Sequence, residues 1–190
     1  MTAQVSDTVS FLGEDFSLCA FSNDEPFNPK EYNYNTVSSS TACYRGYQVE
    51  YLVADKLLVK SVTLNHQDLK AESSRLKKPH DLNCISPVKS KHDFIGAWKF
   101  NDVNLILEYT GNILIGRKFI QGLYRHMGYH PYWKYEVVYE LGFHNGNLSS
   151  SVDISQDVEK FRSNFDPKSE VAYENWISES FERKYSRKNS

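Results

Sequence analysis

The chain has few cysteines, few methionines and no surplus of positive charge. Its three cysteines, Cys19, Cys43 and Cys84, are far apart and odd in number. This argues against a disulfide framework, and the sequence holds no Cys-x-x-Cys pair of the kind that binds zinc. We therefore predict reduced, mostly buried thiols in a cytoplasmic protein. The formal net charge of -2 offers nothing extra to a phosphate backbone, so we expect no nucleic-acid partner.

Long hydrophobic runs are also absent. No stretch reaches the roughly 18 consecutive apolar residues that a membrane-spanning helix requires. The N-terminal stretch MTAQVSDTVSFLGEDFS has neither a basic start nor a long apolar segment, so it does not have the pattern of a signal peptide. From these two absences we expect no membrane partner.

Familiar catalytic motifs are missing as well. The stretch TGNILIGR at 110–117 has two glycines at the spacing of a phosphate loop, but Gly116 is followed by Arg117 and Lys118 instead of Lys and Ser or Thr. No G-x-S-x-G nucleophile elbow occurs. The E-x-K of residues 182–184, a pattern of some metal-dependent nucleases, has no fitting Asp-bearing strand before it. These motifs indicate no enzyme class, and we predict no cofactor.

Tyrosine is what the chain has in quantity. Aromatic residues make up 14% of the sequence, and 13 residues are tyrosine. A tyrosine buries its ring and keeps a polar hydroxyl, so it suits half-buried sheet faces and binding surfaces. The hydrophobic fraction of 40% and the charged fraction of 24% are ordinary for a globular protein, and the length fits one domain.

Alternation with a period of two predicts several strands. Residues 47–53 alternate between a mainly apolar and a more polar face, and residues 58–64 return after a short turn, as in a β-hairpin. A second unit is predicted from residues 103–109 and 113–116, on either side of a turn at 110–112.

Another hairpin has the strongest turn signal in the chain. Residues 135–143 alternate, and residues 148–154 form the partner strand. Between them, Asn145 and Gly146 are the residue types that accept the two positive φ angles of a type I′ turn.

The end of the chain changes character. Asp166 suits a helix N-cap, Pro167 suits the first helical position, and Trp176 is the anchor of the apolar face that follows. We predict an α+β fold with a predominantly antiparallel sheet, open or curled into a half-barrel. Residues 1–165 form one β-rich domain, and residues 166–190 form a C-terminal amphipathic helix packed on it. The alternative is that this helix packs on a second copy in a homodimer.

Two stretches resemble segments that occur together in a family of small uncharacterised bacterial proteins. The first is TACYRGYQVEYLV with the following LLVKSV, and the second is TGNILIGRKFIQGLYRHMGYHPYWKYEVVYELGFHNGNL. Tyr44 stands where the family pattern has tryptophan. The resemblance implies that the N-terminal half and the block 111–148 belong to one domain. It implies no catalytic residue, and it leaves the tail after Ile154 outside.

Within the second stretch, aromatic residues surround two histidines. His126 and His130 are spaced i, i+4, which on a helix puts both imidazoles on one face, as in zinc sites. Gly128 and Pro131 argue against a regular helix, and no third ligand is evident, so we predict no metal. One interpretation is packed histidines. The other is a ligand-binding surface with the candidate residues Arg125, His126, Tyr129, His130 and Trp133.

The second candidate site is the sequence Tyr44, Arg45, Gly46, Tyr47. An arginine between aromatic residues at the start of a strand can present its planar guanidinium to a carboxylate or phosphate. The glycine beside it allows close backbone approach. The plainer interpretation, which we favour, is a structural ion pair. Examples of an expected partner are Glu50, Glu136 and Glu140.

These observations support two functions. The first is a non-enzymatic binding protein that recognises another protein, such as an immunity-type module that neutralises a toxin, or an anionic small molecule in an aromatic and arginine pocket. The second is a small enzyme in which His126 or His130 is the general acid/base, while Arg45 or Arg125 holds an anionic substrate. The enzyme requires a histidine and an arginine to converge in one concave pocket, whereas a binding protein does not.

Overall fold

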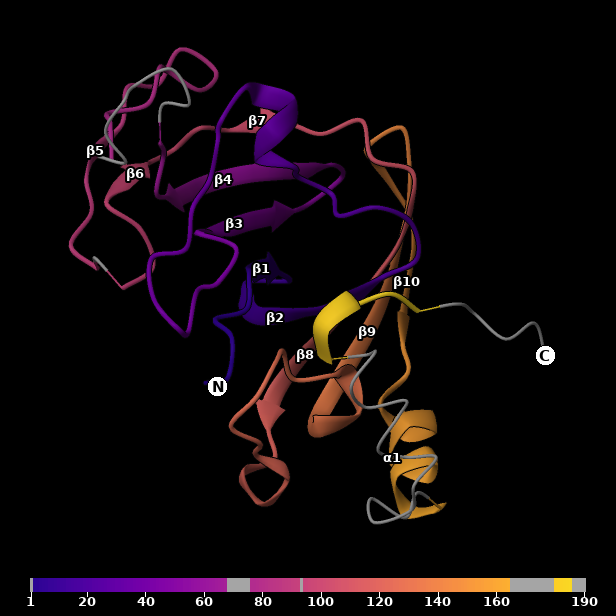
Figure 1. The fold of residues 1–190 in the computed structure, drawn as a ribbon. Helices are drawn as coiled ribbons and strands as arrows, with labels where there is room; N and C mark the ends of the chain where they lie inside the picture. The colour runs from indigo at the N-terminus through magenta and orange to yellow at the C-terminus, as the bar shows by residue number, and fades with distance from the viewer. Residues whose placement is uncertain (1, 68–75, 93, 165–179, 186–190) are drawn as a thin grey trace.

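The computed structural model describes residues 2–67, 76–92, 94–164 and 180–185. Within them, ten strands form one sheet in the order β10-β9-β8-β2-β1-β3-β4-β6-β5, and β7 pairs separately with β4 (Figure 1). The strands are β1 Thr8–Phe11, β2 Glu14–Phe21, β3 Tyr47–Val53, β4 Leu57–Leu64, β5 Val88–Lys89, β6 Trp98–Phe100, β7 Leu105–Ile106, β8 Gly111–Phe119, β9 Tyr135–His144 and β10 Asn147–Asp153. Three short 3-10 helices are η1 Pro29–Tyr32, η2 Gln121–Leu123 and η3 Tyr132–Lys134.

The sheet is mainly antiparallel, as predicted, with a parallel pairing of β1 and β3. β1 and β2 form a hairpin, because Leu12 and Gly13 both take positive φ angles, of 52° and 76°. The chain then makes a long crossover through residues 22–46 before it enters β3 beside β1. Consequently the start of β1, the end of β2 and the start of β3 lie at the same edge of the sheet.

Both hairpins with clear alternation are confirmed. β3 pairs with β4, and the face of β3 that carries Tyr47, Val49, Tyr51 and Val53 is buried. β9 pairs with β10 around Asn145 and Gly146, whose φ angles are 46° and 77°. The sequence signals were sufficient here because each hairpin is specified by its own residues.

The predicted pairing within 103–116 is wrong. β7 pairs with β4, while β8 pairs with β2 and β9, so the two segments do not pair with each other. Leu107 donates its N–H to the Leu57 carbonyl oxygen at 3.0 Å, and both Leu107 and Tyr109 are buried in the core. Alternation predicts that a segment is a strand, but it does not identify the partner strand.

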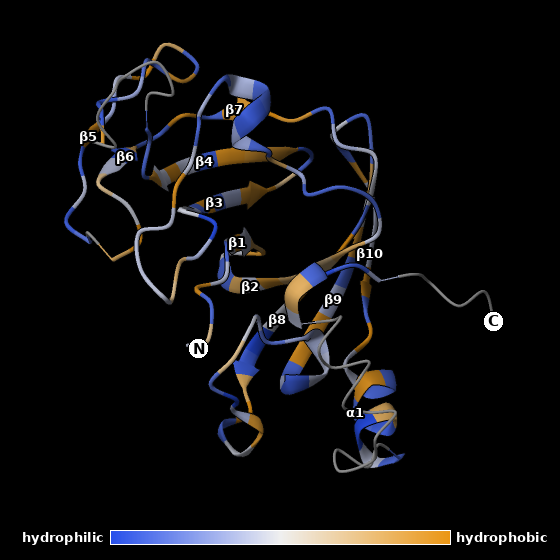
Figure 2. Cartoon of the chain, viewed as in Figure 1, coloured by the Kyte–Doolittle hydropathy of each residue, from blue (hydrophilic) through white to orange (hydrophobic). Residues whose placement is uncertain are grey.

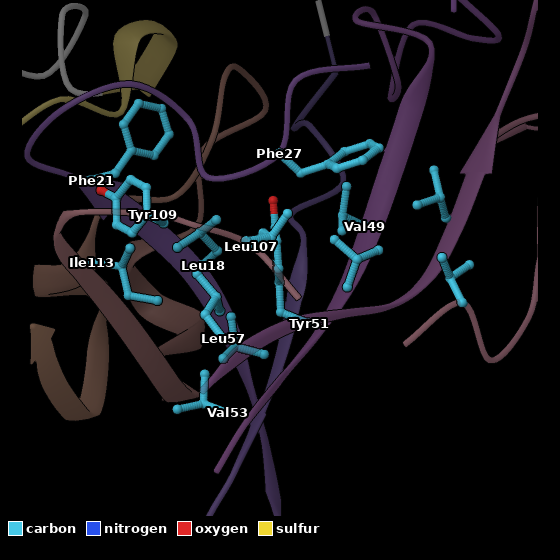
Figure 3. Close-up of a cluster of buried hydrophobic side chains, with 14 of the residues drawn as sticks. Leu18, Phe21, Phe27, Val49, Tyr51, Val53, Leu57, Leu107, Tyr109 and Ile113 are labelled. Atoms are coloured by element: carbon cyan, nitrogen blue, oxygen red, sulfur yellow. The ribbon is translucent and has the colours of Figure 1, made fainter. Parts of the chain in front are cut away.

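The sheet curls around one hydrophobic core without closing. Side chains from β3, such as Val49 and Tyr51, share this core with side chains from β8 and β9, such as Ile113 and Leu141. Figure 3 shows part of the cluster, with rings and aliphatic groups pointing inward from opposite parts of the sheet. Because of this curl, the turn between β3 and β4 lies close to the turn between β9 and β10. The Leu57 N–H donates to the Gly146 carbonyl oxygen at 2.9 Å.

A helix that follows β10 packs on the sheet away from the main core. α1 spans Ser155–Asn164, and its first turn is capped by Asp153, whose carboxylate accepts the Ser155 N–H at 2.9 Å. Val158 is buried, and the Arg162 guanidinium donates to the Trp133 carbonyl oxygen at 2.9 Å. α1 carries both polar and apolar residues, as Figure 2 shows. The fold class is therefore α+β, as predicted.

The helix that we predicted over residues 166–190 falls largely outside the described residues. Of that stretch the structure describes 180–185, where residues 180–182 form a helical turn. From there the chain is extended and pairs with the end of β2 through a bridge between Phe21 and Lys184. In Figure 1 this yellow segment lies against β2. No helix among the described residues is long and apolar enough to span a membrane.

Candidate functional site

A cavity of about 580 Å³ lies where the three central strands begin or end together. Asp7 precedes β1, Glu25 follows β2 and Arg45 precedes β3, so the strand order brings three charged residues to one edge of the sheet. The residues that line the cavity are Thr2, Gln4, Phe21, Glu25, Thr41, Tyr44, Arg45, Tyr47, Gly128, Tyr129, Phe181, Glu182 and Arg183.

Arg45 is placed by a tight turn. The Gly46 N–H donates to the Cys43 carbonyl oxygen at 3.1 Å, and Gly46 has a φ of 76°. A Cβ atom at Gly46 would lie 2.0 Å from the carbonyl oxygen of Val37, so only glycine fits. Arg45 then donates from Nε to the Tyr47 carbonyl oxygen at 3.0 Å, and its guanidinium lies 4.1 Å from the centre of the Tyr47 ring.

Asp7 is a fully buried carboxylate beneath the two arginines of the site. Its Oδ1 accepts the Val49 N–H at 2.7 Å and a hydrogen bond from Arg45 Nη2, and its Oδ2 accepts from Arg183 Nη1 at 3.2 Å. Burial by itself raises the pKa of this carboxyl, but the two guanidinium groups and the hydrogen bonds outweigh it and lower the pKa below the usual 3.8. Asp7 is therefore a fixed negative charge beneath two fixed positive ones.

Arg183 comes from the C-terminal segment, far away in the sequence. The Phe21 N–H donates to the Arg183 carbonyl oxygen at 2.9 Å, and the Tyr129 N–H donates to the Ser180 carbonyl oxygen at 2.7 Å. These bonds dock the segment against β2 and against the stretch before η3. The Arg183 guanidinium lies 4.3 Å from the centre of the Tyr129 ring and is almost fully buried.

Glu25 closes the cluster from the cavity side. Its Oε1 accepts from Arg45 Nη1 and, at 2.5 Å, from Arg183 Nη2, while its Oε2 accepts from the Tyr47 hydroxyl at 2.5 Å. Burial and the neighbouring Glu25 raise the pKa of Tyr47, which keeps that hydroxyl protonated as a donor. Two carboxylates thus face two guanidiniums, and the four charges balance.

The cavity has aromatic walls and an aromatic rim. The rings of Phe21, Tyr47 and Tyr129 are buried around the ion-pair cluster. At the mouth, Tyr44 and Phe181 are 77% and 48% exposed, so two aromatic residues border the cavity where it meets solvent.

The structure divides the predicted site residues into two groups. Tyr44, Arg45, Tyr47 and Tyr129 all line the cavity. The favoured interpretation of Arg45 as a structural ion pair is correct, but its predicted partners were wrong. The partners are Asp7 and Glu25. Of the three predicted partners, Glu50 pairs with Lys99 at 2.7 Å.

The other four predicted residues lie away from the cavity lining. Arg125 and His126 are exposed, and Trp133 is buried in a second core cluster with Val138 and Val158. His130 is partly buried, with its ring centre 4.6 Å from that of Phe119. Burial and the nearby Lys134 ammonium lower the pKa of His130 to about 4. The sequence stretch that looked most like a site is therefore mainly a packing region, although it contributes Tyr129.

Neither histidine belongs to a metal cluster formed by described residues. Across the parts of the chain that the structure describes, no group of three His, Cys, Asp or Glu side chains is arranged to hold a metal ion. Sequence reasoning missed Asp7, Phe21, Glu25 and Arg183. In the sequence, Asp7 and Glu25 lie beside two apolar strands, and this position was the available signal. Only the order of the strands in the sheet shows that these two residues lie close together.

We compared the chain with protein-family models, with curated proteins and with solved structures, and none of them matches it.

Proposed function

We propose that the protein is a non-enzymatic binding protein that holds an anionic small molecule in the cavity beside Arg45 and Arg183. The observation that carries this proposal is the pair of guanidinium groups, fixed by Asp7 at the base of an aromatic-walled cavity of about 580 Å³. Cavities of this size suit small molecules, and guanidinium groups are favoured donors to carboxylates and phosphates. Asp7 holds both groups from the buried side, and on the cavity side both groups donate to Glu25.

The site lacks what the enzyme alternative needs. No histidine is among the described residues that line the cavity, so the general acid/base of that hypothesis is missing from it. Although burial alone would raise it, the paired arginines lower the pKa of Asp7, which makes this carboxylate a weak base. Glu25 forms ion pairs with both arginines, and Glu182 also lines the cavity. The remaining features, ion pairs and rings, are those of recognition.

A protein partner is the second candidate, because of the rim. Tyr44 and Phe181 both line the cavity and are exposed to solvent. Exposed aromatic residues are favoured at protein interfaces, where they insert into pockets of the partner. A partner protein would use the same site if it presented an acidic side chain to the cavity.

Calorimetry with carboxylate and phosphate probes tests the proposal. Arg45→Lys keeps the positive charge beside Asp7 but loses the planar fork that reaches both carboxylates. We expect it to weaken binding of an acid by about tenfold or more. Arg117→Lys is the matched control, since Arg117 forms a surface pair with Glu14 at 3.2 Å. If no acid binds the wild type, or if both variants bind equally well, the small-molecule proposal is wrong.

A further inference from the structure

The two carboxylates of the cluster are not equivalent. Asp7 and Glu25 contact the same two guanidinium groups, but the side chain of Asp7 is 0% exposed and that of Glu25 is 19% exposed. Asp7 also accepts a backbone N–H from Val49, as part of the sheet edge. Glu25 instead belongs to the loop after β2 and lines the cavity. Asp7 is therefore structural, and Glu25 is the carboxylate that stands where a ligand could stand.

The geometry of Glu25 is that of a bound anion. A single oxygen, Oε1, bridges Arg45 and Arg183, and the second oxygen takes the hydroxyl of Tyr47. A ligand carboxylate in this place would find the same three donors. The loop that carries Glu25 is tied at Ser22, whose N–H donates to the Asn112 carbonyl oxygen at 2.9 Å, and at Phe27, which is buried in the core. Asn23 is tied as well, because its Nδ2 donates to the Thr110 carbonyl oxygen at 2.8 Å, which leaves residues 24–26, with the fully exposed Asp24, as the segment that would have to turn Glu25 outward.

We propose that Glu25 is a built-in competitor, and that the ligand is an aromatic carboxylate whose carboxylate replaces that of Glu25 between Arg45 and Arg183. This inference rests on the proposed function and specifies its ligand class. After the exchange the cluster still holds two positive and two negative charges, with Asp7 and the ligand acid as the negative pair. Glu25 then carries its charge into solvent, so no buried charge is left unpaired.

The exchange explains why the ligand needs an aromatic body. Replacing one carboxylate by another leaves the ion pairs unchanged, and Glu25 has the advantage of being tethered to the site. A small acid such as acetate therefore gains nothing over Glu25. An aromatic acid gains the apolar contacts that Glu25 cannot make, because it fills the space between Phe21, Tyr129 and the exposed rim rings of Tyr44 and Phe181.

Isothermal titration calorimetry with naphthalene-2-carboxylate tests this inference. Acetate and naphthalene-2-carboxamide serve as probes that carry only the charge or only the rings, and we expect neither to bind. Glu25→Gln keeps the size of the side chain and removes its charge. In the wild type, only the molecules in which Glu25 has left the arginines can bind, so the apparent affinity is the intrinsic affinity multiplied by that fraction. Glu25→Gln raises the fraction, so we expect it to bind naphthalene-2-carboxylate at least tenfold more tightly than the wild type.

Asp24→Asn is the matched control. It removes the same charge one residue away, from a side chain in solvent that lies 3.8 Å from Lys184. If the gain in Glu25→Gln came only from a less negative protein, Asp24→Asn would show the same gain, and the competitor role would be overturned. We expect its affinity to stay within about twofold of the wild type.

A second variant guards against a loss of folding in Glu25→Gln. Glu25→Asp keeps the charge and shortens the side chain by one methylene group, so the carboxylate can no longer reach Arg45, Arg183 and the Tyr47 hydroxyl together. The internal competitor then loses contacts while the ligand keeps all three donors, so we expect binding about threefold tighter. Weaker or unchanged binding in both variants, with a wild type that binds, overturns the competitor role and leaves the proposed function standing. Absence of binding in the wild type and both variants overturns the proposed function and this inference together.

Discussion

Two aromatic regions of this molecule treat their ionisable groups in opposite ways. At the cavity, Arg45 and Arg183 are buried among rings and stay charged, because Asp7 and Glu25 face them. In the packing region after β8, His130 lies among rings beside the ammonium of Lys134, and the pKa of the imidazole falls to about 4. The cavity region pairs its arginines with carboxylates, whereas the packing region keeps His130 neutral at pH 7.

The difference shows what a binding site needs beyond unusual residues. Burial penalises a charge unless an opposite charge compensates it. The cavity meets this condition with residues from four separate segments, so it can present charge to a ligand at neutral pH. The packing region has no such compensation at His130, and its aromatic residues form core contacts instead. Fixed charge next to open apolar space is the reason for proposing the first region as the site.

The largest effect should follow from breaking the buried end of the charge cluster. Asp7→Asn removes the carboxylate shared by Arg45 and Arg183, and it leaves both guanidiniums partly unpaired in the interior. We expect the free energy of unfolding at pH 7 to fall by about 3 to 5 kcal/mol, measured with urea. Asp157→Asn, at an exposed acid paired with Lys160, is the control and should show no measurable change.

The pH dependence of the same variant gives a signed test. The pKa of Asp7 lies below its usual 3.8 in the folded protein, so the unfolded chain takes up this proton first as the pH falls. The stability that Asp7 contributes is complete above the usual pKa and is lost below it. The gap between wild type and Asp7→Asn should therefore narrow below about pH 4. A gap that stays constant down to pH 3 would show that Asp7 acts through packing and not through its charge.

A smaller but still large effect is expected at the turn that places Arg45. Gly46→Ala puts a methyl group 2.0 Å from the Val37 carbonyl oxygen at a φ of 76°, so the turn must move. We expect a loss of about 3 kcal/mol. Gly13→Ala is a close control, because Gly13 has the same φ of 76° but open space around it, and strain alone should cost about 1 kcal/mol. Equal losses of stability in the two variants would show that the close approach of Gly46 to Val37 does not fix the turn that places Arg45.

The two regions also differ in how far the sequence could predict them. The hairpins β3–β4 and β9–β10 were predictable because alternation and the Asn145–Gly146 turn are local signals. The cavity was half predictable: Arg45 between two tyrosines was recognised, but Asp7 and Arg183 were not. These residues are 176 positions apart, and only the parallel pairing of β1 with β3 and the docking of residues 183–185 beside Phe21 bring them together.

The packing region looked like a binding site in the sequence for a physical reason. Its histidines and rings are close in the sequence, and local density of such residues is what motif reasoning detects. Whether those side chains face solvent or pack inward depends on elements outside the stretch. Here α1 and β8 cover Trp133, and Phe119 covers His130. The helix α1 was itself missed, although Asp153 lies just before it and accepts the Ser155 N–H.

His130 provides a test of the second region by pH. Its pKa is about 4 in the folded protein and 6.5 ordinarily, so the unfolded chain binds the extra proton between these values. Stability should therefore fall as the pH drops from 6.5 to 4, and stay level with respect to this group below 4. Because the ring is only partly buried, screening reduces the expected loss to about 1 to 2 kcal/mol.

His130→Phe should remove this loss, because phenylalanine keeps the ring contacts with Phe119 and takes up no proton. His126→Phe, at the exposed histidine four positions earlier, is the control and should titrate like the wild type. Urea unfolding at pH 7 and pH 4.5 measures the effect. If both variants follow the wild-type pH dependence, the neutral state of His130 is not a property of its burial, and the contrast between the two regions weakens.

The smallest effect on stability, and the most direct comparison of the regions, comes from two exposed tyrosines. Tyr44 lies at the cavity rim and is 77% exposed, and Tyr124 lies in the packing region and is 39% exposed. Alanine at either position should change the free energy of unfolding by less than about 1 kcal/mol. Tyr44→Ala should nevertheless weaken binding of naphthalene-2-carboxylate by about three- to tenfold, because a bound ring loses one wall, whereas Tyr124→Ala should leave the affinity unchanged. An equal loss in both variants would mean that the ligand contacts the two regions together, and the division between a charged site and a packing region would no longer describe how the molecule binds.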